Sequence, residues 1–203
     1  MERISKQEKP ISPEEFFKDK IETYRVSKDN FFKLVRERNP LMDEDKILNA
    51  KGINFEMNGK VVILIRTDVY PEEYMPYLET HEKWEAYIAR KDGFNLWDRS
   101  IRVYKNDKET NLIQEEDERK FFKELEVYNY DFRHEFAIYK EYQQAMKDGK
   151  LNEYHEWFMN LRKKEKLNKN SEDNLKLINN DTEIRESIYK KLTEGMPHIF
   201  TRN

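Results

Sequence analysis

Residues 53 to 66, Ile-Asn-Phe-Glu-Met-Asn-Gly-Lys-Val-Val-Ile-Leu-Ile-Arg, decide the fold class of this chain. Apolar and polar residues alternate up to Met57, which is the pattern of a half-covered strand. Asn58-Gly59 follows, and this pair favours a tight type I′ turn because both of its central positions need a positive φ. A continuous apolar run then covers residues 61–65. The sequence therefore predicts a β-hairpin over residues 53–66, whose second strand is well covered.

Helix signals flank this hairpin on both sides. Residues 12–15, Ser-Pro-Glu-Glu, combine an N-cap serine, a first-turn proline and a glutamate three residues after the cap, which predicts a helix over residues 12–38 that ends before Pro40. Residues 70–73, Tyr-Pro-Glu-Glu, open a second helix over residues 71–91, and Gly93 supplies its left-handed exit.

The second half of the chain is predicted to be helical as well. Residues 94–113 have no clear period and are expected to form a loop. Long helices are expected over residues 114–147 and 151–166, where apolar residues recur at helical spacing. Residues 167–180 are rich in Asn and Lys and are interpreted as a linker, after which Asp181 caps a short last helix. The predicted fold is a single α+β domain over residues 1–166, mainly α with a small sheet, followed by a C-terminal appendage over residues 167–203.

Composition limits the classes of function. The chain has 203 residues, of which 39% are charged, 37% are hydrophobic and 13% are aromatic, and its net charge is -3. The near balance of charge argues against a nucleic-acid partner. No apolar run reaches membrane length and no secretory signal opens the chain, so we expect an intracellular, cytoplasmic protein. Without cysteine, a metal would have to be bound by His, Asp and Glu.

Two polar residues interrupt the apolar face of the predicted helix over residues 71–91. His81 and Glu85 lie four residues apart, so their side chains project side by side in the middle of an apolar stripe. A carboxylate placed there costs several kcal/mol, roughly, unless it is neutralised, paired or bound to a cation. One divalent metal would satisfy both side chains. The apolar members of the stripe are Tyr74, Tyr77, Leu78, Trp84 and Ile88.

The stretch from Gly59 to Glu85, an apolar strand and then a helix with His81-Glu82-Lys83-Trp84-Glu85, resembles the core of zincin-like metallopeptidases. That family has HExxH where this chain has HExxE, and the resemblance covers about residues 55–90. It implies that His81 and Glu85 are zinc ligands and that Glu82 is the general base that activates a metal-bound water. A carboxylate in place of the second histidine would make the metal a weaker Lewis acid.

The zincin resemblance also implies a third ligand from a later element. His134 lies three residues before Ala137 in the predicted helix over residues 114–147, a placement similar to that of the family's downstream ligand. Glu141 follows seven residues after His134, so both lie on the same face of that helix. The expected ligands are His81, Glu85 and His134, with Glu141 as a fourth ligand or as the partner that orients an imidazole.

Structural roles for these residues stay open. His81 can be a buried histidine that bonds to Glu85 or Glu141 and binds no metal. His155 borders an apolar face and is interpreted as a core-edge residue, and His198 is interpreted as solvated. The basic run that begins at Arg162 is interpreted as a solvated helix end.

The predicted function is that of a zincin-like metal-binding protein, with zinc as the expected metal, which hydrolyses peptide bonds in a peptide or protein substrate. The alternative is a non-catalytic helical module that binds a protein partner and carries a degenerate or coincidental HExxE. Convergence of His81, Glu85 and His134 on one point would favour the metal site. A His134 that points elsewhere would favour the module.

Overall fold

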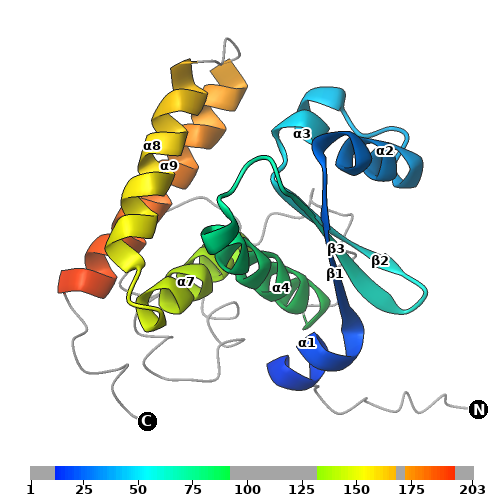
Figure 1. Cartoon of the computed structure of the whole chain (residues 1–203), viewed down its shortest axis with the longest axis horizontal. Coiled ribbons are helices and arrows are strands. Elements are labelled where there is room, and N and C mark those ends of the chain that lie inside the picture. Colours follow the sequence, from blue (N-terminus) through cyan, green and yellow to red (C-terminus); the bar gives the residue numbers. More distant parts are fainter. Residues whose placement is uncertain (1–11, 92–131, 168–171, 195–203) are drawn as a thin grey trace, which may run out of the picture. The chain divides into compact units, whose positions relative to one another are not determined.

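The computed structural model describes residues 12–91, 132–167 and 172–194, which belong to two compact units (Figure 1). The sheet unit comprises Met1–Met75 and Glu82–Asp98, and the helical unit comprises Pro76–His81 and Arg99–Asn203. Helix α4 (Met75–Lys91) contributes residues to both units. Most described residues are helical and one small sheet is present, which confirms the predicted α+β class.

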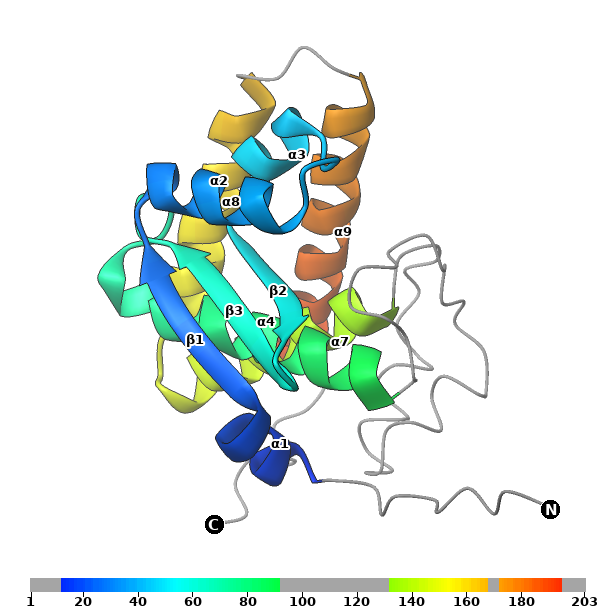
Figure 2. The same cartoon turned by 90° about the vertical axis from the view of Figure 1, so that its right-hand side faces the viewer.

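Three strands form the sheet, in the order β1-β3-β2 (Figure 2). Strands β2 (Gly52–Met57) and β3 (Lys60–Arg66) are antiparallel and form the predicted hairpin. Asn58 and Gly59 have φ values of 53° and 75°, which confirms the expected turn. Every residue of β3 after its first is buried, in keeping with its apolar run.

The single helix predicted over residues 12–38 is wrong, because a strand interrupts it. Helix α1 (Pro13–Lys20) has the predicted capping box at Ser12, but β1 (Ile21–Val26) follows and pairs in parallel with β3. Helix α2 (Lys28–Arg38) then restarts with its own cap at Ser27. The β1 sequence, Ile-Glu-Thr-Tyr-Arg-Val, is rich in β-branched and aromatic residues, and pairing with a buried strand outweighs its moderate helix propensity.

Helices cover both faces of the sheet within this unit. Helices α2 and α3 (Glu44–Asn49) pack on one face, where the core consists of Phe31, Val35, Ile47, Ile53, Phe55, Val62 and Leu64. On the other face, Asn54 of β2 donates a hydrogen bond to Glu82 of α4 at 2.8 Å. Because residues alternate along β2, the apolar Ile53 and the polar Asn54 are committed to opposite faces.

The helical unit is built from the first turns of α4 together with three long helices. The helix predicted over residues 71–91 is present as a 3₁₀ turn, η1 (Glu72–Tyr74), followed by α4. Helix α7 (Phe132–Lys147) is the described part of the helix predicted over 114–147, and α8 (Leu151–Leu167) matches the one predicted over 151–166. The expected loop over 94–113 and the start of the helix at 114 lie outside the described residues.

The linker predicted over residues 167–180 is wrong where the structure describes the chain. Helix α9 (Glu172–Glu194) begins inside that range, and Asp181 is a buried mid-helix residue rather than a cap. Most Asn and Lys residues of α9 are exposed or partly exposed, while four of its apolar residues recur at helical spacing and are buried in a helix that contacts α7 and α8. The buried apolar residues are Ile178, Ile184, Ile188 and Leu192. None of the helices in the described ranges is both long and apolar enough to cross a membrane.

Replacing Gly59 with alanine tests the hairpin turn. A Cβ at this position would meet nothing within 4 Å, so the cost comes from the positive φ of 75° alone. We expect Gly59→Ala to lower the free energy of unfolding by about 1 kcal/mol, measured as a lower denaturation midpoint at unchanged m-value. An unchanged midpoint would mean that the turn is not type I′ in solution.

Candidate metal centre

The structure brings three of the predicted site residues together. Helix α4 places His81 and Glu85 one turn apart, and α7 carries His134. Each of the three offers one ligand atom, and these atoms all lie within 4.8 Å of one another. The imidazole rings of His81 and His134, both in the helical unit, have centroids 4.8 Å apart and are inclined at 74°. His134 therefore points towards His81 and Glu85, which is the arrangement expected to favour a metal site.

The donor set fits a transition-metal ion. Two imidazole nitrogens and one carboxylate oxygen form a His₂Glu set, which catalytic zinc sites use. Ligand atoms of a tetrahedral zinc ion are about 3.4 Å apart, given bond lengths of about 2.1 Å. The observed limit of 4.8 Å is larger, so the three ligand atoms would have to move closer together to bind one ion. A metal bound by three protein ligands would keep a fourth position for water or substrate.

Glu141 holds the imidazole of His81. Its Oε2 lies 2.8 Å from Nδ1 of His81, and the carboxylate is fully buried. Burial alone would raise the pKa of Glu141, but the charge of Arg185 and the hydrogen bond from His81 outweigh burial and lower this pKa to about 2. Of its two predicted roles, Glu141 occupies the position of the partner that orients an imidazole, since it is not in the three-residue group.

Asp181 of α9 holds the second imidazole. Its Oδ1 lies 3.1 Å from Nε2 of His134, and its Oδ2 accepts from Nε of Arg162 at 2.8 Å. Burial opposes ionisation here as well, but Arg185 and Arg162 lower the pKa of Asp181 well below its usual value. The sequence predicts a capping role for Asp181 and does not predict its contact with His134. The sequence signal for this contact is the position of Asp181, three residues from Ile178 and Ile184 on the buried side of α9.

Arg185 joins the two carboxylates. Its guanidinium donates to both oxygens of Glu141, at 2.7 and 3.0 Å, and to Asp181 at 3.3 Å. Only 3% of the residue is exposed, and the guanidinium carbon lies 3.7 Å from the ring centroid of Phe158. Each proposed ligand imidazole is therefore bonded to a carboxylate, and one buried cation is shared by both carboxylates.

Glu82, the predicted general base, faces the sheet of its own unit. Its Oε2 accepts the hydrogen bond from Asn54, and Oε1 approaches β2 so closely that a Cβ at Gly52 would lie 2.6 Å from it. Gly52 is thus required by the close approach of the Glu82 carboxylate. Glu82 is buried and lies outside the three-residue group. Sequence reasoning missed Asn54 and Gly52, because nothing local in β2 indicates a carboxylate opposite.

The two remaining histidines do not join the group. His155 is buried at the edge of the helical core, as expected, where its ring stacks on Tyr189 at 3.8 Å and its Nδ1 lies 3.0 Å from the hydroxyl of Tyr142. Burial lowers the pKa of His155 despite the nearby carboxylate of Glu186. His198 lies outside the described residues. Arg162, expected on a solvated helix end, is instead largely buried by its contacts with Asp181 and Glu165.

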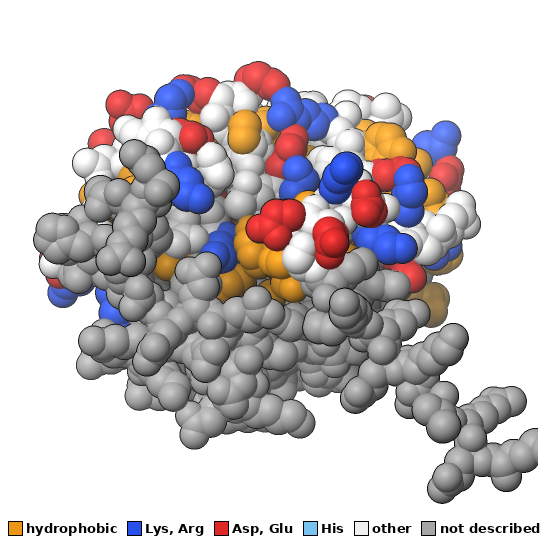
Figure 3. Space-filling model, turned by 90° about the horizontal axis from the view of Figure 1, so that it is seen from below, with side chains coloured by type: hydrophobic (Ala, Val, Ile, Leu, Met, Phe, Trp, Pro, Cys, Tyr) orange, Lys and Arg blue, Asp and Glu red, His pale blue; other side chains and the backbone are white. Residues whose placement is uncertain are grey.

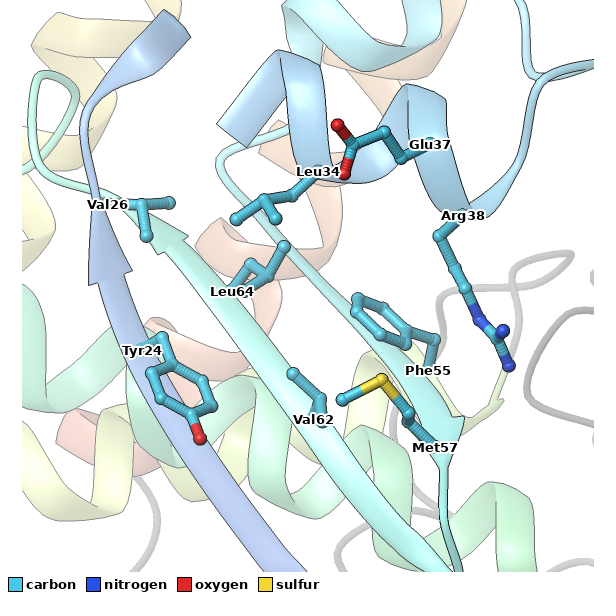
Figure 4. Close-up of a pocket in the computed structure, with 9 residues that line it drawn as sticks. All are labelled: Tyr24, Val26, Leu34, Glu37, Arg38, Phe55, Met57, Val62 and Leu64. Carbon is cyan, nitrogen blue, oxygen red and sulfur yellow. The ribbon is translucent and has the colours of Figure 1, made fainter. Parts of the chain in front are cut away.

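Other surface features of the described residues offer less chemistry. A cavity of about 390 Å³ lies between α2 and the sheet (Figure 4), with Glu37 and Arg38 as its charged residues. Its other lining residues are Tyr24, Val26, Leu34, Phe55, Met57, Val62 and Leu64. On the face seen in Figure 3, the described basic and acidic side chains are intermixed, without an extended basic surface for nucleic acid.

Comparison of this chain with models of known protein families, with curated proteins and with solved structures gives no match. The resemblance to zincin-like metallopeptidases thus stays a prediction from the sequence. The geometry of the three-residue group and of its buried carboxylates carries the functional argument.

The lowered pKa of Glu141 predicts acid sensitivity of the metal-free protein. A carboxyl with a folded pKa of about 2, against an ordinary value of 4.5, stabilises the fold above pH 4.5 and loses this contribution as the pH falls towards 2. At about 1.4 kcal/mol per unit, the loss is about 3 kcal/mol. We expect the difference in unfolding free energy between wild type and Glu141→Gln, measured with chelator present, to shrink steadily below pH 5.

Glu156→Gln provides the control for this measurement, because Glu156 is an exposed carboxyl on α8. The difference between this variant and wild type, measured over the same pH range, is the reference against which the change in Glu141→Gln is judged. A constant difference for Glu141→Gln would show that Glu141 gains no stabilisation from Arg185 and His81.

Proposed function

We propose that this protein binds a divalent transition metal, with zinc the best fit, through His81, Glu85 and His134. The observation that carries the proposal is the convergence of these three donors, whose ligand atoms lie within 4.8 Å of one another. Imidazole and carboxylate donors suit zinc, and a chain without cysteine has no thiolate to offer.

The surroundings of the two imidazoles support this proposal. Metal-binding histidines usually donate their second ring N–H to a carboxylate or a carbonyl, which fixes the ring and makes the ligand more basic. Glu141 and Asp181 lie in that position against His81 and His134, at 2.8 and 3.1 Å.

Metal content tests the proposal directly. Wild-type protein, stripped with chelator and then dialysed against zinc, should bind one equivalent, measured by elemental analysis and by competition titration. His81→Ala, Glu85→Ala and His134→Ala should each lower zinc affinity by at least about 100-fold, because each removes one of three ligands.

His155→Gln is the matched control, since it removes a buried histidine outside the group. It should retain one equivalent of zinc at wild-type affinity. Absence of zinc from the wild type, or unchanged affinity in His81→Ala, would disprove the metal site.

The three-ligand set also supports a catalytic role, the hydrolysis of peptide bonds. A bound metal would supply Lewis acidity and would lower the pKa of a coordinated water. Glu82 is the candidate proton acceptor, because it neighbours His81 on α4 and its carboxylate is shielded from solvent. Both of its oxygens lie against β2 in this structure, so the base role requires Glu82 to exchange its contact with Asn54 for water.

Glu82→Gln separates metal binding from catalysis. A glutamine can still accept the hydrogen bond from Asn54 through its Oε1 but cannot take a proton, so we expect unchanged zinc affinity and at least a 100-fold loss of kcat. The measurement is cleavage of a quenched fluorescent peptide library by the zinc-loaded protein, with chelator-treated protein as the blank.

Asn54→Ala serves as the comparison variant for the base. It removes the contact that holds Glu82 against β2 while leaving the carboxylate in place, so cleavage should persist. Full activity in Glu82→Gln would exclude Glu82 as the base. Zinc binding without cleavage of any peptide would identify a non-catalytic metal-binding protein and would favour the alternative of an interaction module.

A further inference from the structure

We infer that Arg185 sets the tautomers of both ligand imidazoles, so that a metal meets Nε2 of His81 and Nδ1 of His134. Arg185 is then a positioning residue that acts on the site through Glu141 and Asp181. Which nitrogens bind metal rests on the proposed function, but the tautomers themselves do not.

Arg185 can only donate hydrogen bonds. A guanidinium has five N–H groups, no acceptor, and stays charged in proteins. Two of its nitrogens contact the two oxygens of Glu141, at 2.7 and 3.0 Å, and the hydroxyl of Tyr154 donates to the same carboxylate. A carboxylate that receives these bonds is held in its ionised form, which can only accept.

His81 has to donate to the ionised carboxylate of Glu141. Because Glu141 offers an acceptor, the nitrogen of His81 that lies 2.8 Å from it, Nδ1, must carry the proton. A neutral imidazole has one N–H and one lone pair, so the lone pair of His81 is on Nε2. A metal ligand needs that lone pair.

Asp181 fixes the tautomer of His134 in the same way, but it contacts Nε2 of that ring instead of Nδ1. Asp181 receives bonds from Arg162 and Arg185, so it too is an ionised acceptor. The nitrogen of His134 that contacts Asp181 is Nε2, at 3.1 Å, so Nε2 carries the proton and the lone pair is on Nδ1. The two imidazoles are therefore held in opposite tautomers by one shared cation.

Burial makes this arrangement rigid. Arg185, Glu141 and Asp181 are 3%, 0% and 4% exposed. A charged group in such surroundings is costly without its partners, so neither carboxylate can readily take up a proton and become a donor. The imidazoles are thus prepared for a metal before it arrives, and binding needs no change of tautomer.

Imidazole ¹⁵N NMR of the full-length, metal-free protein tests this inference, at a pH about two units above the ordinary histidine pKa of about 6.5. In wild type, we expect His81 to show the Nδ1–H tautomer and His134 the Nε2–H tautomer. The reverse pattern, or a doubly protonated ring at either position, would overturn the inference.

Two variants change one histidine each and act as controls for each other. In Glu141→Gln, the side-chain oxygen can accept from Arg185 while the amide donates to Nδ1 of His81, so His81 should switch to the Nε2–H tautomer and His134 should not change. Asp181→Asn should switch His134 alone. Each variant should also lower zinc affinity by 10- to 100-fold. An unswitched tautomer in a folded variant would overturn the inference.

Arg185→Lys keeps a donor-only cation and should retain both wild-type tautomers, whereas Arg185→Gln, which can accept as well as donate, should not hold them. If the Gln variants do not fold, the wild-type spectrum and Arg185→Lys still decide the question. Wild-type protein with the expected tautomers but no zinc binding would refute the proposed function and leave the tautomer inference standing.

Discussion

The described part of the helical unit depends on the buried contacts of Arg185 with Glu141 and Asp181. Burying a charge is tolerated only with its partners, and removal of one member of such a set typically costs 3–5 kcal/mol, roughly. Arg185 and Asp181 come from α9 and Glu141 from α7, while Tyr154 of α8 donates to the same carboxylate. The three long helices are therefore joined by these polar contacts as well as by apolar packing. The two carboxylates of this group also contact the imidazoles of His81 and His134.

Helix α4 serves two different environments with adjacent residues. His81 contacts Glu141 in the helical unit, whereas the next residue, Glu82, contacts Asn54 in the sheet unit. Successive residues on a helix are about 100° apart, so neighbouring side chains can face different surroundings. In a zincin-like motif the histidine and the glutamate are expected to act on one substrate. Here the carboxylate of Glu82 accepts a hydrogen bond from Asn54 of β2. Proposed metal binding by His81 does not depend on this contact, whereas a base role for Glu82 would require the contact to break.

Local signals explain what could be predicted from the sequence. The hairpin follows from alternation and from Asn58-Gly59, and the candidate ligands follow from polar residues that interrupt apolar faces. The errors come from partners distant in sequence. Strand β1 exists because it pairs with β3, and no local pattern encodes that pairing. Arg185 lies 44 residues from Glu141, and Asp181 lies 47 residues from His134. In the sequence both resemble ordinary charged residues of a wet helix face.

Because the helical unit is built from separate stretches of the chain, its contacts can form only in the order in which those stretches are synthesised. His81 leaves the ribosome 60 residues before Glu141, and Arg185 follows 44 residues after Glu141. At roughly 5–20 residues per second, His81 waits about 3–12 s for its carboxylate. The carboxylate then waits a further few seconds for its cation. During this interval the buried contacts of His81 and Glu141 are incomplete, so the helical unit is completed only after Arg185 has been synthesised.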